Sequence, residues 1–168
     1  MPTQSDILTV EQTLIDFLEA NLSTHPYYAL VGTDISGLGY HLGGRDLLIK
    51  TPAIIVEMQD PWEVVTNPNW MAGPHEDTGT CAIIGMLERN ERERQELDIR
   101  YLAVAILQTL NSVKAIVDTT SGQELVGWAR RLQIKQNTPS AELFVESNKD
   151  RVFRTCKVEY EFMIAANA

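Results

Sequence analysis

Residues 152–164 read Val-Phe-Arg-Thr-Cys-Lys-Val-Glu-Tyr-Glu-Phe-Met-Ile and carry the clearest secondary-structure signal in the chain. Large apolar side chains alternate with polar or charged ones, which is the two-residue period of a β-strand with one buried face. The predicted strand spans residues 151–165. Its inner face, apart from Arg154, is predicted to carry Val152, Cys156, Val158, Tyr160, Phe162 and Ile164. A strand of this kind implies a sheet that is covered on one side.

Two helices are predicted to cover that sheet. Residues 6–22 repeat apolar side chains every three to four positions, which is the pattern of an amphipathic helix, and the helix should end before Pro26. A longer helix is predicted over residues 91–113, where a charged segment leads into the apolar segment 101–110. Its first half should face water, and its second half should be buried.

Further strands are predicted on both sides of the long helix. Pro52 precedes a β-branched run at residues 53–58, and residues 79–88 form a second apolar run in which Gly85 suggests a bulge. Residues 128–136 alternate like a half-buried strand, with Trp128 expected in the core. Shorter extended pieces are predicted at residues 27–31 and 114–117.

These elements together predict an α+β fold in which a small mixed or antiparallel sheet is packed by the N-terminal helix and the long central helix. A length of 168 residues favours a single domain over residues 1–168. Two long loops are expected. One spans about 32–46 and holds much of the glycine, and the other spans about 59–78 and holds three prolines and two tryptophans.

The composition excludes several classes of protein. With 44% apolar and 22% charged residues, the chain can build a core, unlike a disordered or collagen-like chain. Two cysteines, Cys81 and Cys156, are too few for a disulfide framework, so we expect reduced core thiols. No apolar run is long enough to cross a bilayer, and the first residues lack the features of a signal peptide. We therefore expect the mature protein to be cytoplasmic.

The charge is unevenly distributed along the chain. Residues 1–80 contain eleven acidic side chains but only two basic ones, Arg45 and Lys50, whereas residues 81–168 contain twelve of each sign. Nucleic-acid binders neutralise phosphates with clustered Lys and Arg, so tight binding of DNA or RNA is disfavoured. The acidic half is either a solubilising surface or an acidic wall that meets a basic partner or lets polyanions pass.

Catalytic and ligand-binding motifs are weak throughout. The glycines of residues 37–44 do not match a phosphate-binding loop, and no metal-site spacing joins the candidates, which are His25, His41, His75, Glu76, Asp77 and Cys81. Asp46, Lys50 and Glu57 stand in the reverse of the usual nuclease order, and no nucleophile elbow is present. The sequence therefore favours a protein that is not an enzyme, with no cofactor and no metal.

The tryptophans of the second long loop suggest contacts rather than chemistry. Trp62 and Trp70 either lie at a protein interface, where an aromatic body with one polar N–H is useful, or pin their own loop to the core. The candidate interface residues are Trp62, Trp70, Tyr40, Arg45, Arg92 and Arg94.

The order of these elements resembles the tail-terminator, or tail-completion, proteins of long-tailed bacteriophages. The resemblance rests on the N-terminal helix, the Pro-led strand 52–58, the strand at 81–86 that runs into the helix at 91–113, and the terminal strand ending in Val158-Glu-Tyr-Glu-Phe-Met. It covers about residues 5–166 and depends on element order and hydrophobic pattern, with no single motif.

The resemblance implies a structural virion protein. It would form a ring, expected to be a hexamer, that caps the tail tube, ends tube polymerisation and offers a surface for joining the head. Its partners would be copies of itself, the tube protein, a sheath protein where one exists, and a neck or connector protein. DNA would only pass through the channel, and no membrane would be involved. The alternatives are another neck or head-completion protein, or a small metal-dependent enzyme built around His41 and His75.

Overall fold

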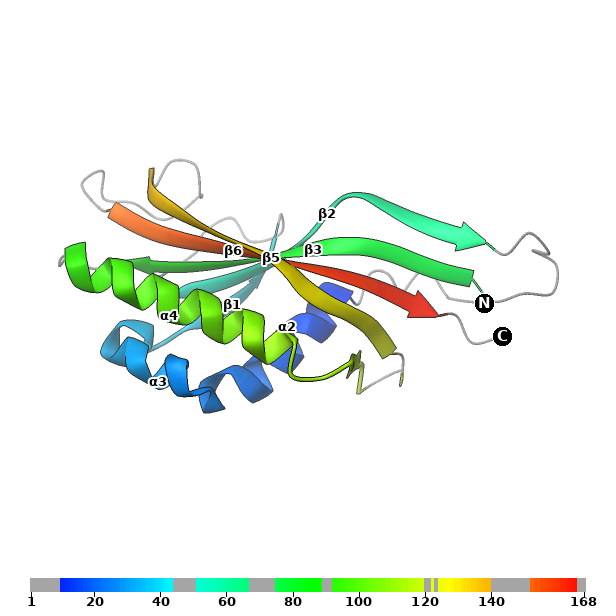
Figure 1. Ribbon diagram of the computed structural model, residues 1–168, viewed down its shortest axis with the longest axis horizontal. Coiled ribbons are helices and arrows are strands. Elements are labelled where there is room, and N and C mark those ends of the chain that lie inside the picture. Colours follow the sequence, from blue (N-terminus) through cyan, green and yellow to red (C-terminus); the bar gives the residue numbers. More distant parts are fainter. Residues whose placement is uncertain are drawn as a thin grey trace.

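The computed structural model describes residues 10–43, 51–66, 75–88, 92–119, 122, 124–139 and 152–165. Within them, a six-stranded sheet carries helices on one face, so the predicted α+β class is confirmed (Figure 1). The strands are β1 (Gly39–Leu42), β2 (Ala53–Thr66), β3 (His75–Glu88), β4 (Ala115–Val117), β5 (Glu124–Pro139) and β6 (Val152–Ala165). The helices are α2 (Val10–Asn21), α3 (Pro26–Val31) and α4 (Arg92–Leu110), with 3₁₀ turns η1 (Leu22–Thr24) and η2 (Gly32–Ile35).

The strand order is β1-β2-β3-β6-β5-β4, and only the β1–β2 pair is parallel, so the sheet is mixed as predicted. The sheet is curled rather than flat. Helix α2 contacts β1 and β2 at one edge of the sheet and β4 at the other. Helix α4 lies under β3, β6 and β5 and contacts α3 on its other side. The result is a half-barrel whose hollow is filled by helices.

The alternation of β6 is confirmed, since Cys156, Val158, Tyr160, Phe162 and Ile164 are all buried in the core below the helices. One detail of the prediction is wrong. Arg154 was set apart from the inner face, yet it is only 2% exposed. It continues the row of alternate residues, so the strand geometry turns it inward with its neighbours.

Gly85 of β3 was predicted to mark a bulge, and this is also wrong. It pairs in regular register with Ile54 of β2 and Cys156 of β6. A Cβ atom at this position would lie 3.0 Å from Leu102 Cδ2 and 2.9 Å from Cys156 Sγ. The glycine therefore makes room for helix α4 to pack closely on the sheet.

Both predicted long loops contain regular structure. β2 continues to Thr66 and β3 begins at His75, so much of the expected loop at 59–78 is a pair of antiparallel strands. The pairing register shifts between Gln59 and Glu63, a stretch that includes Pro61, and proline has no N–H for a strand ladder. The expected loop at 32–46 contains η2 and the edge strand β1.

Residues 27–31 were predicted to be extended but form helix α3. His25 and Pro26 end the first helical segment as expected, and they also begin the next one. Pro26 occupies the first turn, where its missing N–H is harmless, and the His25 ring accepts a hydrogen bond from the Tyr27 N–H. A proline therefore serves here as a helix start.

The sheet is longer than the helical layer. In Figure 1, the C-terminal ends of β2 and β6 and the first residues of β3 run well past the end of α4. The sheet face opposite the helices carries a small cluster of its own, in which Ala53, Ile55 and Met86 are buried and Ile84 is half-buried. No helix among the described residues is long and apolar enough to span a membrane.

Candidate functional site

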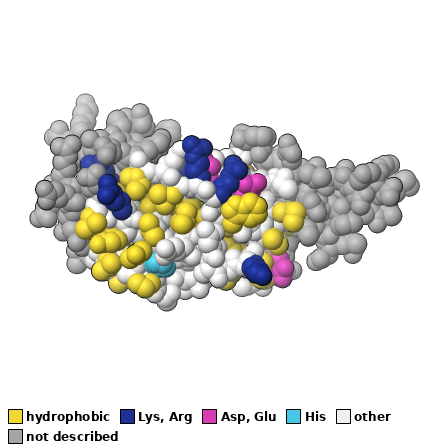
Figure 2. Space-filling view, viewed as in Figure 1, with side chains coloured by type: hydrophobic (Ala, Val, Ile, Leu, Met, Phe, Trp, Pro, Cys, Tyr) yellow, Lys and Arg dark blue, Asp and Glu magenta, His cyan; other side chains and the backbone are white. Residues whose placement is uncertain are grey.

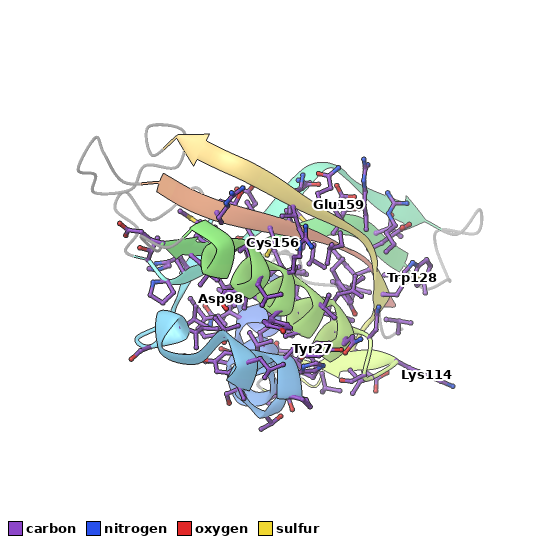
Figure 3. All side chains as sticks on the ribbon, turned by 60° about the vertical axis from the view of Figure 1, so that its left-hand side comes forward. Tyr27, Asp98, Lys114, Trp128, Cys156 and Glu159 are labelled. Atoms are coloured by element: carbon purple, nitrogen blue, oxygen red, sulfur yellow. The ribbon has the colours of Figure 1, made fainter. Side chains whose placement is uncertain are left out.

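The most exposed large apolar side chain of the described residues is Trp128 on β5, with 57% of its surface accessible. It was predicted to lie in the core, and that prediction is wrong. Gly127 and Ala129 face the helices, so Trp128 points from the opposite face, beside Glu161 of β6. Figure 3 shows its side chain at the end of β5, away from the helical layer.

The backbone that carries Trp128 is held by the end of helix α4. The Ala129 N–H donates to Asn111 Oδ1 at 2.8 Å, and Asn111 Nδ2 donates to the Ala129 carbonyl at 3.1 Å. A register shift between Ala129 and Arg131 leaves Arg130 opposite no β6 residue. The asparagine thus satisfies backbone groups at the bulge and fixes the direction of the neighbouring tryptophan.

We call Trp128, Val126 and Met163 the Trp128 patch. Val126 is exposed, stands two residues before Trp128 on the same strand face, and is paired with Met163 of β6. Charged side chains border the patch. Arg130 forms an ion pair with Glu161 at 3.0 Å, and Lys157 lies 3.6 Å from Glu159. Figure 2 shows hydrophobic side chains over β5 next to side chains of both charges.

A partly open groove lies between helix α2 and the edge strand β4. It encloses about 170 Å³, and its lining is more apolar than polar. Its walls are formed by Thr13, Asp16, Phe17, Ala20, Asn21, Val117, Asp118 and Thr119. Among the described residues, the lining therefore carries two carboxylates and no basic side chain.

A second apolar surface, which we call the α3–α4 surface, lies on the helical layer. Its members are Tyr27 and Leu30 of α3 and Leu97 and Tyr101 of α4, and the rings of Tyr27 and Tyr101 stack at 5.7 Å. Figure 2 shows a broad group of hydrophobic side chains over these helices, and Figure 3 shows Tyr27 between them. The chain thus has two separate apolar surfaces.

Three of the metal-site candidates, His25, His41 and Cys81, have described side chains and lie on different elements, whereas the side chains of His75, Glu76 and Asp77, at the start of β3, lie outside the description. His25 caps α3 through Nδ1, and its Nε2 lies 2.9 Å from Gln108 Oε1, so both ring nitrogens are used within the fold. His41 is on β1, and Cys81 is buried in the core. Among the described residues, no three His, Cys, Asp or Glu side chains are placed to hold a metal ion.

Four of the six predicted interface residues lie on three different elements, and the other two lie outside the described residues. Tyr40 is half-buried on β1 and packs against the core, and burial raises the pKa of its phenol, with smaller contributions from Tyr28 and Glu19. Trp62 lies within β2 rather than in a loop, and Arg92 and Arg94 begin helix α4. Arg45 and Trp70 fall outside the described residues. The interface role of all six stays a prediction.

Sequence reasoning missed the Trp128 patch, although one signal for it was present. Leu125 and Ala129 are buried, and Val126 and Trp128 occupy the opposite phase of the same strand. An alternation read from Leu125 onward would have turned Trp128 outward. The prediction started the strand at Trp128 itself, so the alternation of buried and exposed residues before Trp128 was not used.

Comparisons with known proteins return a likeness in fold alone. No family model matches the chain, and no curated protein matches it. Among solved structures, one chain described as "Virion of native gene transfer agent (GTA) particle" superimposes with a TM-score of 0.53. The two share 13% sequence identity, and the match covers 98% of this chain and 100% of that one.

The match in fold covers the elements that carry the apolar surfaces described above. Because it spans nearly the whole of both chains, it includes the curled sheet, the helical layer and the elements that carry the Trp128 patch. At 13% identity it establishes a shared fold and does not show what each surface binds.

The two cysteines are predicted to be inert in the folded protein. Both are buried, and burial raises the pKa of Cys156 from 9.0 to about 12; burial and then Glu11 raise that of Cys81. A thiol-reactive dye should label neither residue in the native chain and both after unfolding in urea. Rapid labelling of the native chain would contradict the packing described here.

The same shifts predict a loss of stability at alkaline pH. These thiols ionise near pH 9 when unfolded but only near or above pH 12 when folded, and burial likewise raises the pKa of Tyr160 to about 12. The free energy of unfolding should therefore be insensitive to these groups below pH 9 and fall as the pH rises from 9 to 12. Urea titrations followed by circular dichroism at several pH values would measure this, and unchanged midpoints would contradict it.

Proposed function

We propose that this chain is a structural subunit of a phage-like virion and acts as a tail terminator. In this role it forms a ring, most simply a hexamer, on the last ring of the tail tube and ends tube polymerisation. The observation that carries the proposal is the correspondence in fold, over almost the full length of both chains, with a chain of a gene transfer agent virion. The order of elements in the sequence points to the same class.

The surfaces of the chain support an assembling role. A closed ring of more than two identical subunits repeats one contact between two different surfaces of each subunit. This chain exposes the Trp128 patch on its sheet and the groove between α2 and β4, so two different surfaces are available for such a contact. The ends of β2, β3 and β6, which extend past the helical layer, add a surface for a neighbour or for the tube (Figure 1).

The charge distribution supports a role in which DNA passes the protein without being bound. Residues 10–43, which form α2, α3 and β1, contain no Lys or Arg and four acidic residues. A surface of this kind repels phosphates. In the proposed ring, the acidic residues of this part that a neighbouring copy does not cover face the channel, so DNA passes through it without being bound. In the virion, the completed ring lies between the tail tube and the neck protein that is attached to the head.

The proposal is tested by growing tubes from the virus's own tube protein with and without this chain. We expect tubes to elongate without limit when the chain is absent and to stop, with one extra ring at an end, when it is present. Electron microscopy measures tube length, and mass photometry of the chain should show a species near six times 18.9 kDa, either alone or on the tube. Double-stranded DNA added to the ring should remain unbound at physiological salt.

Two outcomes would contradict the proposal. Tubes of unchanged length without an added ring would exclude a terminator. Binding to the connector of the head instead of the tube would favour a neck protein of another kind. Neither outcome depends on which surface joins the copies.

A further inference from the structure

Trp128 is held in position before any partner binds, so it can act as an anchor, which is a side chain that the partner buries. It is mostly exposed, and its strand is fixed by Asn111 through two hydrogen bonds to Ala129 and by pairing with β6. A rigid aromatic side chain loses little conformational entropy when it is buried in a partner, and tryptophan is enriched among residues that dominate interfaces.

The groove between α2 and β4 has the properties of a receptor for such an anchor. Phe17, Ala20 and Val117 supply an apolar lining, and Val117 is itself 49% exposed. Asp16 and Asp118 lie beside this lining. The groove is small and partly open to solvent, which suits a protruding side chain of another protein better than an enclosed small molecule.

The charges next to the anchor and the groove are complementary. Arg130 and Arg131 follow Trp128 and are exposed, whereas the exposed side of α2 carries Asp16 and Glu19, and the whole helix has no basic residue. Arg130 already pairs with Glu161, but both side chains are about half exposed, and such surface pairs contribute little. The arginine is therefore available to a stronger partner.

The anchor and the groove also occupy different surfaces. Trp128 leaves the sheet on the face opposite the helices, and the groove is bounded by α2, a member of the helical layer. A contact between them joins unlike surfaces, which is the arrangement that extends from copy to copy and can close a ring.

From these four observations we propose that neighbouring copies of this chain join head to tail, with Trp128 of one copy seated in the α2–β4 groove of the next and Arg130 and Arg131 facing Asp16 and Asp118. The inference rests on the proposed ring and specifies its contact. The occupant of the groove is thus a second copy of this chain.

Site-directed cross-linking tests the contact directly. The native thiols are buried, so new cysteines can be added without removing them. The double variant Val126→Cys/Ala20→Cys keeps Trp128 and places one new thiol beside it, at an exposed position of the same patch. Treated with a short bismaleimide after assembly, it should give a ladder of covalent oligomers up to the size of the ring. Each single variant should give no ladder. A product that stops at the dimer would indicate a two-fold contact and overturn the head-to-tail arrangement.

Mixing the two single variants identifies the occupant. A tagged Val126→Cys chain and an untagged Ala20→Cys chain should cross-link to each other within mixed rings. If Val126→Cys instead cross-links only to the tube protein or to the neck protein, then the patch serves that partner and the inference is wrong.

Charge reversal gives a second and independent readout. Asp16→Lys and Arg131→Glu should each weaken self-association by about tenfold or more, and the combined variant should recover most of the loss. Trp128→Ala should weaken it by at least about tenfold, whereas Leu30→Ala, an exposed residue on the α3–α4 surface, should not. Circular dichroism checks that each variant is folded.

The failure of this inference can be told apart from the failure of the proposed function. Rings that form and cap tubes normally with Trp128→Ala, and that give no cross-linked ladder, would overturn the contact and leave the terminator role intact. A wild-type chain that forms no ring, alone or on the tube, would overturn both.

Discussion

Replacing Gly127 with alanine should lower the free energy of unfolding by about 3 kcal/mol or more. A Cβ atom at this position would collide with the carbonyl oxygen of Glu161 and would lie 2.9 Å from Phe162 Cα. These atoms belong to the backbone of β6, so relief requires β5 and β6 to separate. Urea unfolding followed by circular dichroism measures the loss.

Gly122→Ala is the matched control for this prediction. Gly122 has a φ of +74°, and nothing lies within 4 Å of its Cβ position, so alanine there suffers only from the unfavourable dihedral angle. We expect a loss of about 1 kcal/mol. Equal losses in the two variants would show that the close approach of β5 to β6 is not what requires glycine at position 127.

Leu102→Ala should lower the free energy of unfolding by about 2–5 kcal/mol. Leu102 is 0% exposed and packs on the sheet beside Gly85, where its Cδ2 occupies the space that a glycine leaves. Truncation opens a cavity between α4 and β3 that the packed neighbours cannot fill. Thermal and urea unfolding would both report the effect.

Leu97→Ala in the same helix is the matched control, because it removes the same side-chain atoms from an exposed position. Leu97 is 40% exposed, so its truncation should change stability by no more than about 0.5 kcal/mol. Similar losses of stability in both variants would contradict the placement of α4.

Regular elements with a strong period were predictable from the sequence. The alternation that ends in Ile164 gave β6, the apolar repeat before Pro26 gave α2, and the change from charged to apolar residues gave α4 with its buried second half. These patterns are local consequences of strand and helix geometry, so they can be read without knowing the neighbours. The α+β class follows from them.

Elements that depend on a distant partner were not predictable. β1 is four residues long and contains no clear period, and it exists because β2 offers it a parallel edge from Ala53 to Val56. β2 itself runs through Pro61 to Thr66 because β3 pairs with it again beyond the register shift. Strand length is decided by the hydrogen bonds available across the sheet, and a single strand does not contain that information.

The candidate site was predicted least well, for the same physical reason. The sequence pointed to aromatic and basic residues at contacts between proteins, but it placed the exposed tryptophan in the core. Whether Trp128 faces the helices or the solvent depends on its phase relative to β6 and on the bulge that Asn111 stabilises.

The sequence by itself determined the fold class, the amphipathic helix, the half-buried long helix and the acidic character of the N-terminal half, because periodicity and charge are properties of the local chain. Tertiary structure alone decided how far the strands extend, that Arg154 is buried, that α2 and β4 border a groove, and that Trp128 is exposed. Each of these depends on which face or edge another element covers, and that is settled only when segments far apart in the chain meet.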